Sequence, residues 1–183
     1  AGYPTAHQPR PMDIDSDGRD EIVAGYALLN PDGSVRWVLR EKDGGRFDGH
    51  LDCARLYSRG HSLEQTRMVL TFCSGNRLAM VDGNGRILWD RTGNHYQSVD
   101  IGKVCPGIPG RQIVVDISAS GKSPIQVIEG DGELSGEISA KGSRFHRLVD
   151  WTGNGMHEII IGRDGCMIDG KGRKIAVFER SIP

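Results

Sequence analysis

Short apolar runs recur along this chain at a nearly constant interval. Their first residues lie 46, 45 and 46 positions apart, and the runs are Ile22–Ala24, Met68–Leu70, Ile113–Val115 and Ile159–Ile161. A second apolar pair follows each run and leads into a turn rich in Asp and Gly; these segments are Leu28–Gly33, Met80–Gly85, Val127–Gly132 and Met167–Gly172. Asp-Gly between two apolar runs is a strong hairpin signal, because both residues tolerate positive φ. The pattern therefore predicts one β-hairpin in each repeat.

Each repeat also has a segment of strand character after the turn and another before the apolar run. The segments after the turn are Val35–Val38, Ile87–Trp89, Leu134–Ile138 and Lys174–Phe178, and those before the run are 51–56, 96–101 and 145–150. No stretch shows sustained helical periodicity with caps, so essentially no helix is expected. A period of about 45 residues with three or four strands is typical of a propeller blade.

We therefore predict an all-β protein, a β-propeller of about four blades in a single domain over residues 1–183. The repeats are predicted at residues 5–48, 49–93, 94–143 and 144–183. The four blades either close on themselves, pair with a second copy, or belong to a longer propeller. A β-sandwich or a solenoid built from the same strands is the alternative fold.

Charge and cysteine content exclude several functions. The 23 basic and 24 acidic residues give a net charge of -1, which provides no electrostatic case for binding nucleic acid or an anionic membrane. No run is long and apolar enough to span a bilayer. The four cysteines form no CxxC pair, which argues against a zinc ribbon or a thioredoxin-type site. Two disulfides and buried free thiols are both compatible with their positions, Cys53, Cys73, Cys105 and Cys166.

Two stretches just before the first and fourth apolar runs match each other position for position. In the first, Asp13–Glu21, alternating acids precede a glycine and a closing glutamate. Carboxylate oxygens in such a tight loop suit Ca2+, and the spacing is not that of an EF-hand. The predicted ligands are the side chains of Asp13, Asp15, Asp17 and Glu21 and the carbonyl of Arg19. A metal-free Asp/Gly turn is the alternative, and repulsion among the acids disfavours it. Binding to such a loop contributes to folding, because like charges cannot collapse until a cation neutralises them.

The fourth-repeat loop, Asp150–Glu158, has only two formal negative charges. It either binds Ca2+ weakly or is a turn held by side-chain hydrogen bonds alone. Its candidate ligands are Asp150, Thr152, Asn154 and Glu158. Arg67 and Gln112 stand where the closing glutamate would be in repeats two and three, so those repeats are expected to be metal-free.

These phrases resemble a known group of repeats. Asp-x-Asp-x-Asp-Gly-x-x-Glu-Ile-Val, followed by a hairpin and a Trp, resembles the calcium-binding FG-GAP/VCBS type of propeller repeat. Within that group, Gly49–Asp52, Asn94–Lys103 and Val149–Gly155 resemble the propellers of rhamnogalacturonan-lyase-type polysaccharide lyases. The resemblance implies an extracellular or periplasmic protein that acts on an acidic polysaccharide or another carbohydrate, by β-elimination if it is an enzyme.

Candidate catalytic residues lie in the segments that open the repeats. His50 and His95 each stand 18 residues before an apolar run, and Tyr96 follows His95. A polysaccharide lyase needs a base, an acid and a group that neutralises the uronate. We therefore assign His50, His95 and Tyr96 as catalytic candidates, and Arg55, Lys103 and Arg147 as substrate-binding candidates.

Two other interpretations remain open at this point. Repeat-equivalent histidines can serve a structural hydrogen bond at each blade start, or two of them can ligate a transition metal. The chain can then be a non-catalytic carbohydrate- or protein-binding module, or one part of a larger propeller. A homodimer is a further possibility, because four blades are few for a closed ring.

Overall fold

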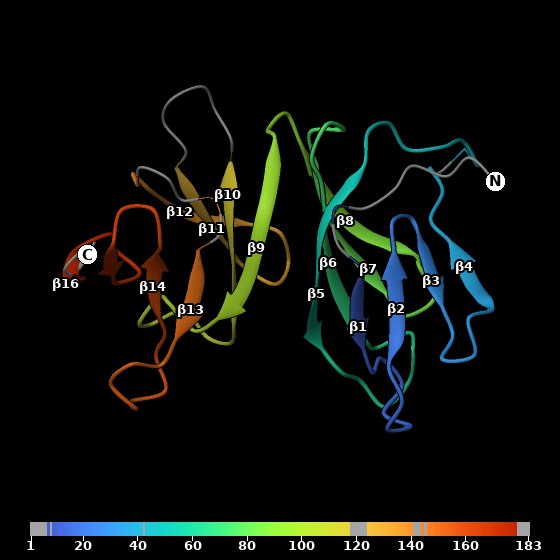
Figure 1. Ribbon diagram of the computed structural model, residues 1–183, viewed down its shortest axis with the longest axis horizontal. Helices are drawn as coiled ribbons and strands as arrows, with labels where there is room; N and C mark the ends of the chain where they lie inside the picture. Colours follow the sequence, from blue (N-terminus) through green and yellow to red (C-terminus); the bar gives the residue numbers. More distant parts are fainter. Residues whose placement is uncertain are drawn as a thin grey trace, which may run out of the picture. The chain divides into compact units, whose positions relative to one another are not determined.

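The computed structural model describes residues 7, 9–41, 43–117, 124–140, 144 and 146–178. In this part of the chain every regular element is a β-strand, and the strands form four antiparallel four-stranded sheets without a helix (Figure 1). The prediction of an all-β protein is confirmed for these residues. None of them belongs to a helix that could cross a membrane.

Strand order within each sheet follows the chain, so every sheet is a simple meander. The first sheet contains β1 (Arg10–Met12), β2 (Glu21–Ala24), β3 (Ala27–Leu29) and β4 (Val35–Val38). The second contains β5 (Leu51–Ser58), β6 (Arg67–Phe72), β7 (Arg77–Asp82) and β8 (Ile87–Thr92). Each apolar run found in the sequence is the second strand of its sheet.

The third and fourth sheets repeat this plan. The third contains β9 (Tyr96–Gly102), β10 (Gln112–Ile117), β11 (Ile125–Ile128) and β12 (Leu134–Ile138). The fourth contains β13 (Arg147–Val149), β14 (Glu158–Ile161), β15 (Cys166–Ile168) and β16 (Lys174–Val177). Phe145, placed in the last opening segment by the sequence, lies outside the described residues. Each of the four sheets falls within one of the expected repeat ranges.

The hairpins between the third and fourth strands differ from the two-residue turn that Asp-Gly predicts. In the first sheet the amide of Gly33 donates to the carbonyl of Asn30 at 2.9 Å, and Gly33 has φ 82°. The other three sheets have the same bond and a positive-φ glycine, namely Gly85, Gly132 and Gly172. Asp32 and Asp82 do not have positive φ, and glycine alone takes the left-handed position of each turn. The hairpin predicted in each repeat is confirmed. A register shift follows in every sheet, because a turn closed by a left-handed glycine inserts a β-bulge.

The chain divides into two compact units, residues 1–96 and 97–183, and each holds two sheets. In the first unit the alternating apolar residues of the first and second sheets share one core. Its fully buried members include Ile14, Leu28, Leu51, Met68 and Phe72. The opening strands β1 and β5 of the two sheets lie against each other.

Close backbone approach fixes how the first sheet meets the second. The indole Nε1 of Trp37 on β4 donates to the carbonyl of Gly83 at 3.0 Å. A Cβ on Gly85 would come within 2.9 Å of the Trp37 ring, so only glycine fits at that turn. Trp37 of the first repeat therefore packs against the hairpin of the second repeat.

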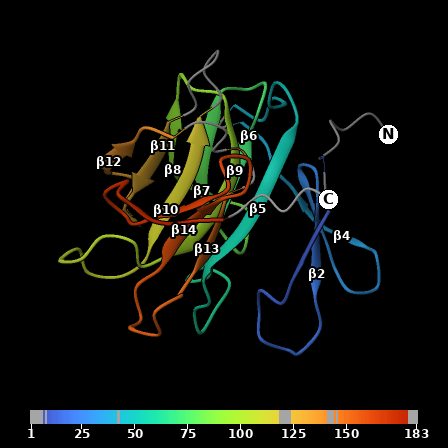
Figure 2. The same ribbon diagram turned by 60° about the vertical axis from the view of Figure 1, so that its left-hand side comes forward.

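The second unit has a core of its own between the third and fourth sheets. Val114, Val127, Ile159 and Ile168 are among its buried members. β13 lies beside β9 in both views (Figures 1 and 2), where Asp100 Oδ2 accepts a hydrogen bond from the Leu148 amide at 3.2 Å.

All four cysteines are free thiols, of which Cys53, Cys73 and Cys166 are buried. The structure therefore contains buried thiols rather than the two disulfides that the cysteine count allows. Burial, and then the nearby charge of Glu129, raises the pKa of the partly exposed Cys105 thiol.

Candidate functional site

The loop from β1 to β2 is folded around its own carboxylates. Asp13 accepts hydrogen bonds from the amides of Ser16 at 2.7 Å and Gly18 at 3.3 Å. Asp17 accepts one from the Arg19 amide at 2.8 Å. Ser16 and Gly18 have φ of 65° and 84°, a conformation that lets alternate side chains point inward. Of the alternating acids, Asp13 and Asp15 converge with Glu21.

Glu21 closes this loop from inside the unit. Its side chain is fully buried, and its Oε2 accepts a hydrogen bond from the Ile14 amide at 3.1 Å. The ligand oxygens of Asp13, Asp15 and Glu21 all lie within 4.8 Å of one another. The side chain of Asp17, predicted as a further ligand, is not part of this group of three. The carbonyl of Arg19 stays a predicted ligand.

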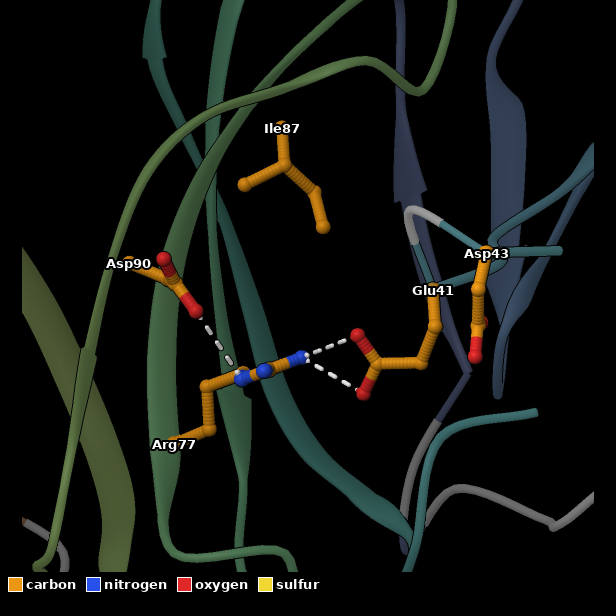
Figure 3. Close-up of a pocket in the computed structure, with 5 residues that line it drawn as sticks. All are labelled: Glu41, Asp43, Arg77, Ile87 and Asp90. Atoms are coloured by element: carbon orange, nitrogen blue, oxygen red, sulfur yellow. Dashed lines mark hydrogen bonds and ion pairs between the residues drawn. The ribbon is translucent and has the colours of Figure 1, made fainter. Parts of the chain in front are cut away.

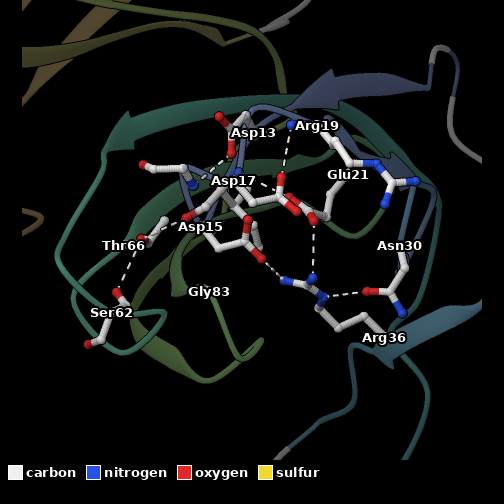
Figure 4. Close-up of polar contacts among 12 residues, drawn as sticks. Asp13, Asp15, Asp17, Arg19, Glu21, Asn30, Arg36, Ser62, Thr66 and Gly83 are labelled. Carbon is white, nitrogen blue, oxygen red and sulfur yellow. Dashed lines mark hydrogen bonds and ion pairs between the residues drawn. The ribbon is translucent and has the colours of Figure 1, made fainter. Parts of the chain in front are cut away.

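Arg36 on β4 supplies a charge that sequence reasoning did not foresee. Its Nη1 lies 2.9 Å from Asp15 Oδ2, and its Nη2 lies 3.0 Å from Glu21 Oε1 (Figure 4). The second contact is an ion pair without hydrogen-bond alignment, so the buried Oε1 has no hydrogen bond among the described residues. Arg59 also contacts the loop, donating to the Asp13 carbonyl at 2.7 Å. Repulsion among the acids is thus partly relieved by arginine.

The donor set fits a hard cation. Three carboxylates converge, they come from a short loop, and one of their oxygens is buried without a hydrogen bond. Ca2+ takes such oxygens at about 2.3–2.6 Å in flexible geometry. A bound cation would compete with the Arg36 guanidinium for Asp15 and Glu21, because both positive groups need the same oxygens.

The fourth-repeat loop has the same backbone hydrogen bonds with fewer charges. Glu158 accepts from the Trp151 amide at 2.9 Å, Asp150 from Gly155 at 2.9 Å, and Asn154 from Met156 at 2.8 Å. These three bonds correspond one by one to those of Glu21, Asp13 and Asp17 in the first loop. Thr152 is exposed, and no arginine in the described part of the chain forms an ion pair with Asp150 or Glu158.

The loop of the third sheet has the same capping bond without the charge. Gln112 is fully buried, and its Oε1 accepts from the amides of Val104 at 2.9 Å and Cys105 at 3.2 Å. The side-chain amide of Gln112 therefore caps the backbone of its loop as the Glu21 carboxylate caps the first loop. In the second sheet Arg67 stands at this position, and the buried hydroxyl of Thr66 reaches the carbonyl of Ile14 at 3.0 Å instead.

A second cluster of ligating side chains lies where β5 begins. His7, His50 and Asp52 each offer one atom, and these atoms lie within 4.8 Å of one another. The His7 and His50 rings meet edge to face at 4.5 Å, and His7 Nε2 lies 3.8 Å from Asp52 Oδ1. His50 Nδ1 lies 3.1 Å from Ser74 Oγ, and its Nε2 is buried with no hydrogen-bond partner among the described residues. These groups can bind a metal ion or transfer protons.

The sequence assignment found His50 here but not its partners. His50 and Asp52 are two positions apart in extended chain, so their side chains share one face. That alternation was visible in the sequence. His7 comes from the opening segment of the preceding repeat, and only the folded structure places it there.

His95 and Tyr96 contact residues outside the His7–His50–Asp52 cluster. His95 Nε2 lies 2.7 Å from the Sγ of the buried Cys73. Tyr96 is 1% exposed, and its hydroxyl accepts from the side-chain amide of Asn94 at 3.3 Å. His146 is fully buried against the Val114 carbonyl at 3.0 Å, as expected of a structural histidine.

The predicted substrate-binding residues are divided between the units. Arg55 belongs to the first unit with His50, and one of its Nη1 contacts is the Ala54 carbonyl at 3.0 Å. Lys103 and Arg147 belong to the second unit and are exposed there. The Lys103 carbonyl accepts a hydrogen bond from the His157 amide at 2.6 Å, and the Lys103 amide donates one to His157 Nδ1 at 3.3 Å.

An open cavity of about 470 Å³ lies in the first unit (Figure 3). Arg77 crosses it, with Nη1 at 2.8 Å from Glu41 Oε1 and Nε at 3.1 Å from Asp90 Oδ2. Asp43 and Ile87 complete the lining. With three carboxylates to one guanidinium, this cavity disfavours an anionic sugar, so it is not a uronate site.

No protein-family model matches the chain, and no curated protein matches it at a significant level. Among solved structures it is similar to the V. cholerae biofilm matrix protein Bap1, with 8% identity and a TM-score of 0.60 over 92% of this chain and 54% of Bap1. It is also similar to the rhamnogalacturonan lyase YesW, with 17% identity and a TM-score of 0.53 over 93% of this chain and 31% of the lyase. The chain therefore spans about half of the first protein and a third of the second. At these identities the likeness concerns the fold alone.

Proposed function

We propose that the chain is a calcium-stabilised β-propeller module of the cell exterior or periplasm that acts on an acidic polysaccharide. In this proposal residues 1–183 form one domain with four blades. Its support is the succession of four equivalent meanders, the close approach of the opening strands β1 and β5, and the glycine contact between neighbouring sheets. Fold likeness to a rhamnogalacturonan lyase and to a biofilm matrix protein favours a carbohydrate as ligand.

The His7–His50–Asp52 cluster is the observation that carries an enzymatic role. If the Nδ1–H of His50 donates to Ser74 Oγ, the Nε2 atom keeps its lone pair and is a base. Asp52 Oδ1 lies 3.8 Å from His7 Nε2 and orients that ring, and His7 is assigned as the acid. One imidazole that accepts a proton and one that donates a proton thus lie side by side.

The reaction is β-elimination across C4 and C5 of a uronate. His50 Nε2 removes the C5 proton after a shift of the neighbouring His7 ring uncovers this buried atom. The electron pair of the C5–H bond forms the C4–C5 double bond, and the bond from C4 to the glycosidic oxygen breaks. His7 protonates the departing oxygen. A cationic side chain must neutralise the uronate carboxylate to make the C5 proton acidic, and Arg55 of the same unit is the candidate.

Non-catalytic binding is the second candidate function, and a specific observation favours it. Two of the three predicted catalytic side chains are engaged in the interior, because Tyr96 is 1% exposed and His95 contacts buried Cys73. A binding module needs only His50 and its neighbours as a polar surface.

Ultraviolet absorbance of the unsaturated uronate separates the two functions. The wild-type chain is incubated with pectic, ulvan-type and glucuronan polymers in the presence of Ca2+. We expect a signal that is lost in His50→Gln and retained in His61→Gln, whose histidine lies in an exposed loop. Absence of product with every polymer would overturn the lyase proposal, and retardation of the chain in gels containing the polymer would then support the binding module.

A further inference from the structure

The His7–His50–Asp52 cluster of the first unit contains a buried nitrogen that no described group satisfies. His50 Nδ1 lies 3.1 Å from Ser74 Oγ, whereas Nε2 of the same ring is buried without a hydrogen-bond partner among the described residues. Burying a polar atom without a partner is unfavourable. With the ring proton on Nδ1, the Nε2 atom has a lone pair that can bind a metal ion.

Backbone contacts hold Ser74 against His50. The His50 carbonyl accepts a hydrogen bond from the Cys73 amide at 3.1 Å. A Cβ on Gly49 would come within 2.5 Å of the Gly75 nitrogen and 2.6 Å of Ser74 Oγ, so the turn after β6 lies directly against the residue before His50. A metal-ligating histidine usually donates its other ring N–H to a hydrogen-bond acceptor, which fixes the tautomer and the orientation of the ring. Ser74 Oγ is placed to be that acceptor.

His7 and Asp52 bring two further ligand atoms to His50. The His7 amide donates to the Leu51 carbonyl at 3.2 Å, so the His7 backbone is attached to the start of β5. Asp52 lies in a β-bulge, because the register with β6 passes from Leu51 to Cys53. Bulges re-aim side chains, and here the Asp52 side chain is only 12% exposed, with Oδ1 at 3.8 Å from His7 Nε2. The local backbone therefore favours the convergence of the three groups.

Two imidazoles and one carboxylate suit Zn2+ better than Ca2+ or Mg2+. Hard cations prefer oxygen, whereas Zn2+ binds nitrogen and oxygen at about 2.0–2.2 Å and often has three protein ligands and one water. At these bond lengths the ligand atoms of a tetrahedral site lie about 3.3 Å apart. The three ligand atoms of the cluster lie within 4.8 Å of one another. The His7 side chain is 53% exposed, so a shift of its ring can close the remaining gap.

We propose that His7 Nε2, His50 Nε2 and Asp52 Oδ1 form a Zn2+ site with water as the fourth ligand. The site is separate from the acidic loop before β2, whose candidate ligands are all oxygens. The ion uses the lone pair of His50 Nε2, which is the base in the proposed elimination, so bound Zn2+ blocks removal of the C5 proton. Metal binding is independent of the proposed function, whereas this inhibition rests on it.

Calorimetric titration of the whole untagged chain with Zn2+ tests the site. Excess Ca2+ is present throughout, so that Ca2+ competes for the acidic loop. We expect one ion to bind to each wild-type chain. His7→Gln and Asp52→Asn should each raise the dissociation constant by about a hundredfold, because loss of a ligand should cost no less than loss of an outer-shell partner. His61→Gln is the matched control, since this exposed loop histidine is outside the cluster, and its affinity should equal that of wild type.

Co2+ is a spectroscopic probe of the ligand type. The pair of Cys73 Sγ and His95 Nε2, 2.7 Å apart, is the competing site in the same unit. We expect the visible absorption of tetrahedral Co2+ without the intense near-ultraviolet band that a thiolate ligand adds. A thiolate band would overturn the proposal, and so would binding that is lost in His95→Gln but retained in His7→Gln. Absence of Zn2+ binding to the wild-type chain would overturn it as well.

Elimination assays distinguish failure of the metal site from failure of the proposed function. With a polymer that yields unsaturated product, Zn2+ should suppress the reaction and a zinc-selective chelator should restore it. If Zn2+ binds at the cluster but no polymer yields product, the metal site is supported and the lyase function fails. If product forms but Zn2+ does not bind, the metal site fails and the lyase function is supported. An unchanged rate in the zinc-saturated chain would overturn the use of His50 Nε2 as both ligand and base.

Discussion

The first and fourth loops share their capping hydrogen bonds but differ in the charges of their side chains. The bonds from Glu21 to Ile14 and from Glu158 to Trp151 are equivalent, and each loop has a left-handed glycine at the same place. The first loop gathers three carboxylates and two arginines, whereas the fourth relies on Asp150 and Glu158 with uncharged Thr152 and Asn154 between them. Loop shape in this protein is therefore set by side-chain caps, and cation affinity is a separate property.

Loss of the closing glutamate should have the largest effect. Glu21→Ala leaves the Ile14 amide without an acceptor and Arg36 without a buried partner, so we expect a loss of about 4 kcal/mol in unfolding free energy. Glu158→Ala removes only the bond to Trp151 and should cost about 1 kcal/mol. Urea denaturation measures both. Equal losses would mean that Arg36 and the surrounding acids add nothing in the first loop.

Removal of Ca2+ should have the second-largest effect on stability. At a free concentration about a hundred times the dissociation constant, a bound ion stabilises by about 2.7 kcal/mol, which corresponds to a shift of roughly 8 °C in a chain of this size. EGTA should therefore lower the melting temperature of the wild-type chain.

Glu21→Gln is the control for that experiment. Gln112 shows that an amide can cap the loop, so this variant should fold but lose the response to EGTA. An unchanged wild-type melting curve would rule out a structural calcium site.

Adding the acids of the first loop to the fourth loop tests whether the shared backbone is sufficient for Ca2+ binding. Thr152→Asp with Asn154→Asp gives the fourth loop the acids of the first on the same backbone. Calorimetry should then show a second Ca2+ site in the variant. If no site appears, the backbone equivalence of the two loops is not sufficient for binding.

Arg36 tests whether its guanidinium and the cation use the same oxygens. Arg36→Met frees Asp15 and Glu21, so the dissociation constant for Ca2+ should fall by about tenfold, equal to about 1.4 kcal/mol. The matched control is Arg173→Met, because Arg173 forms the equivalent pair with Asp169 in a hairpin of the fourth sheet. An unchanged affinity in Arg36→Met would remove Asp15 and Glu21 from the ligand set.

The smallest effects should be equal in the two loops. Gly18→Ala and Gly155→Ala meet no neighbouring atom, so each should cost only the strain of positive φ, about 1 kcal/mol. Thermal denaturation of both variants measures the difference between them. A much larger loss at Gly18 alone would show that the first loop is held more rigidly than its hydrogen bonds indicate.

The strands are legible in the local pattern of residues. Apolar runs 45 or 46 residues apart form the second strand of every sheet, because a short continuous apolar run is typical of a buried strand. The acids of the first loop converge because alternation in a tight loop places them on one side. Strands and tight loops depend on residues that are neighbours in the chain, so they can be predicted from the sequence alone.

Contacts between groups from distant segments depend on how the sheets pack. Arg36 reaches Glu21 because β4 folds back past the loop, and His7 reaches His50 from the preceding repeat. Pairing of charges and rings over long separations depends on sheet packing, which no local pattern of residues specifies.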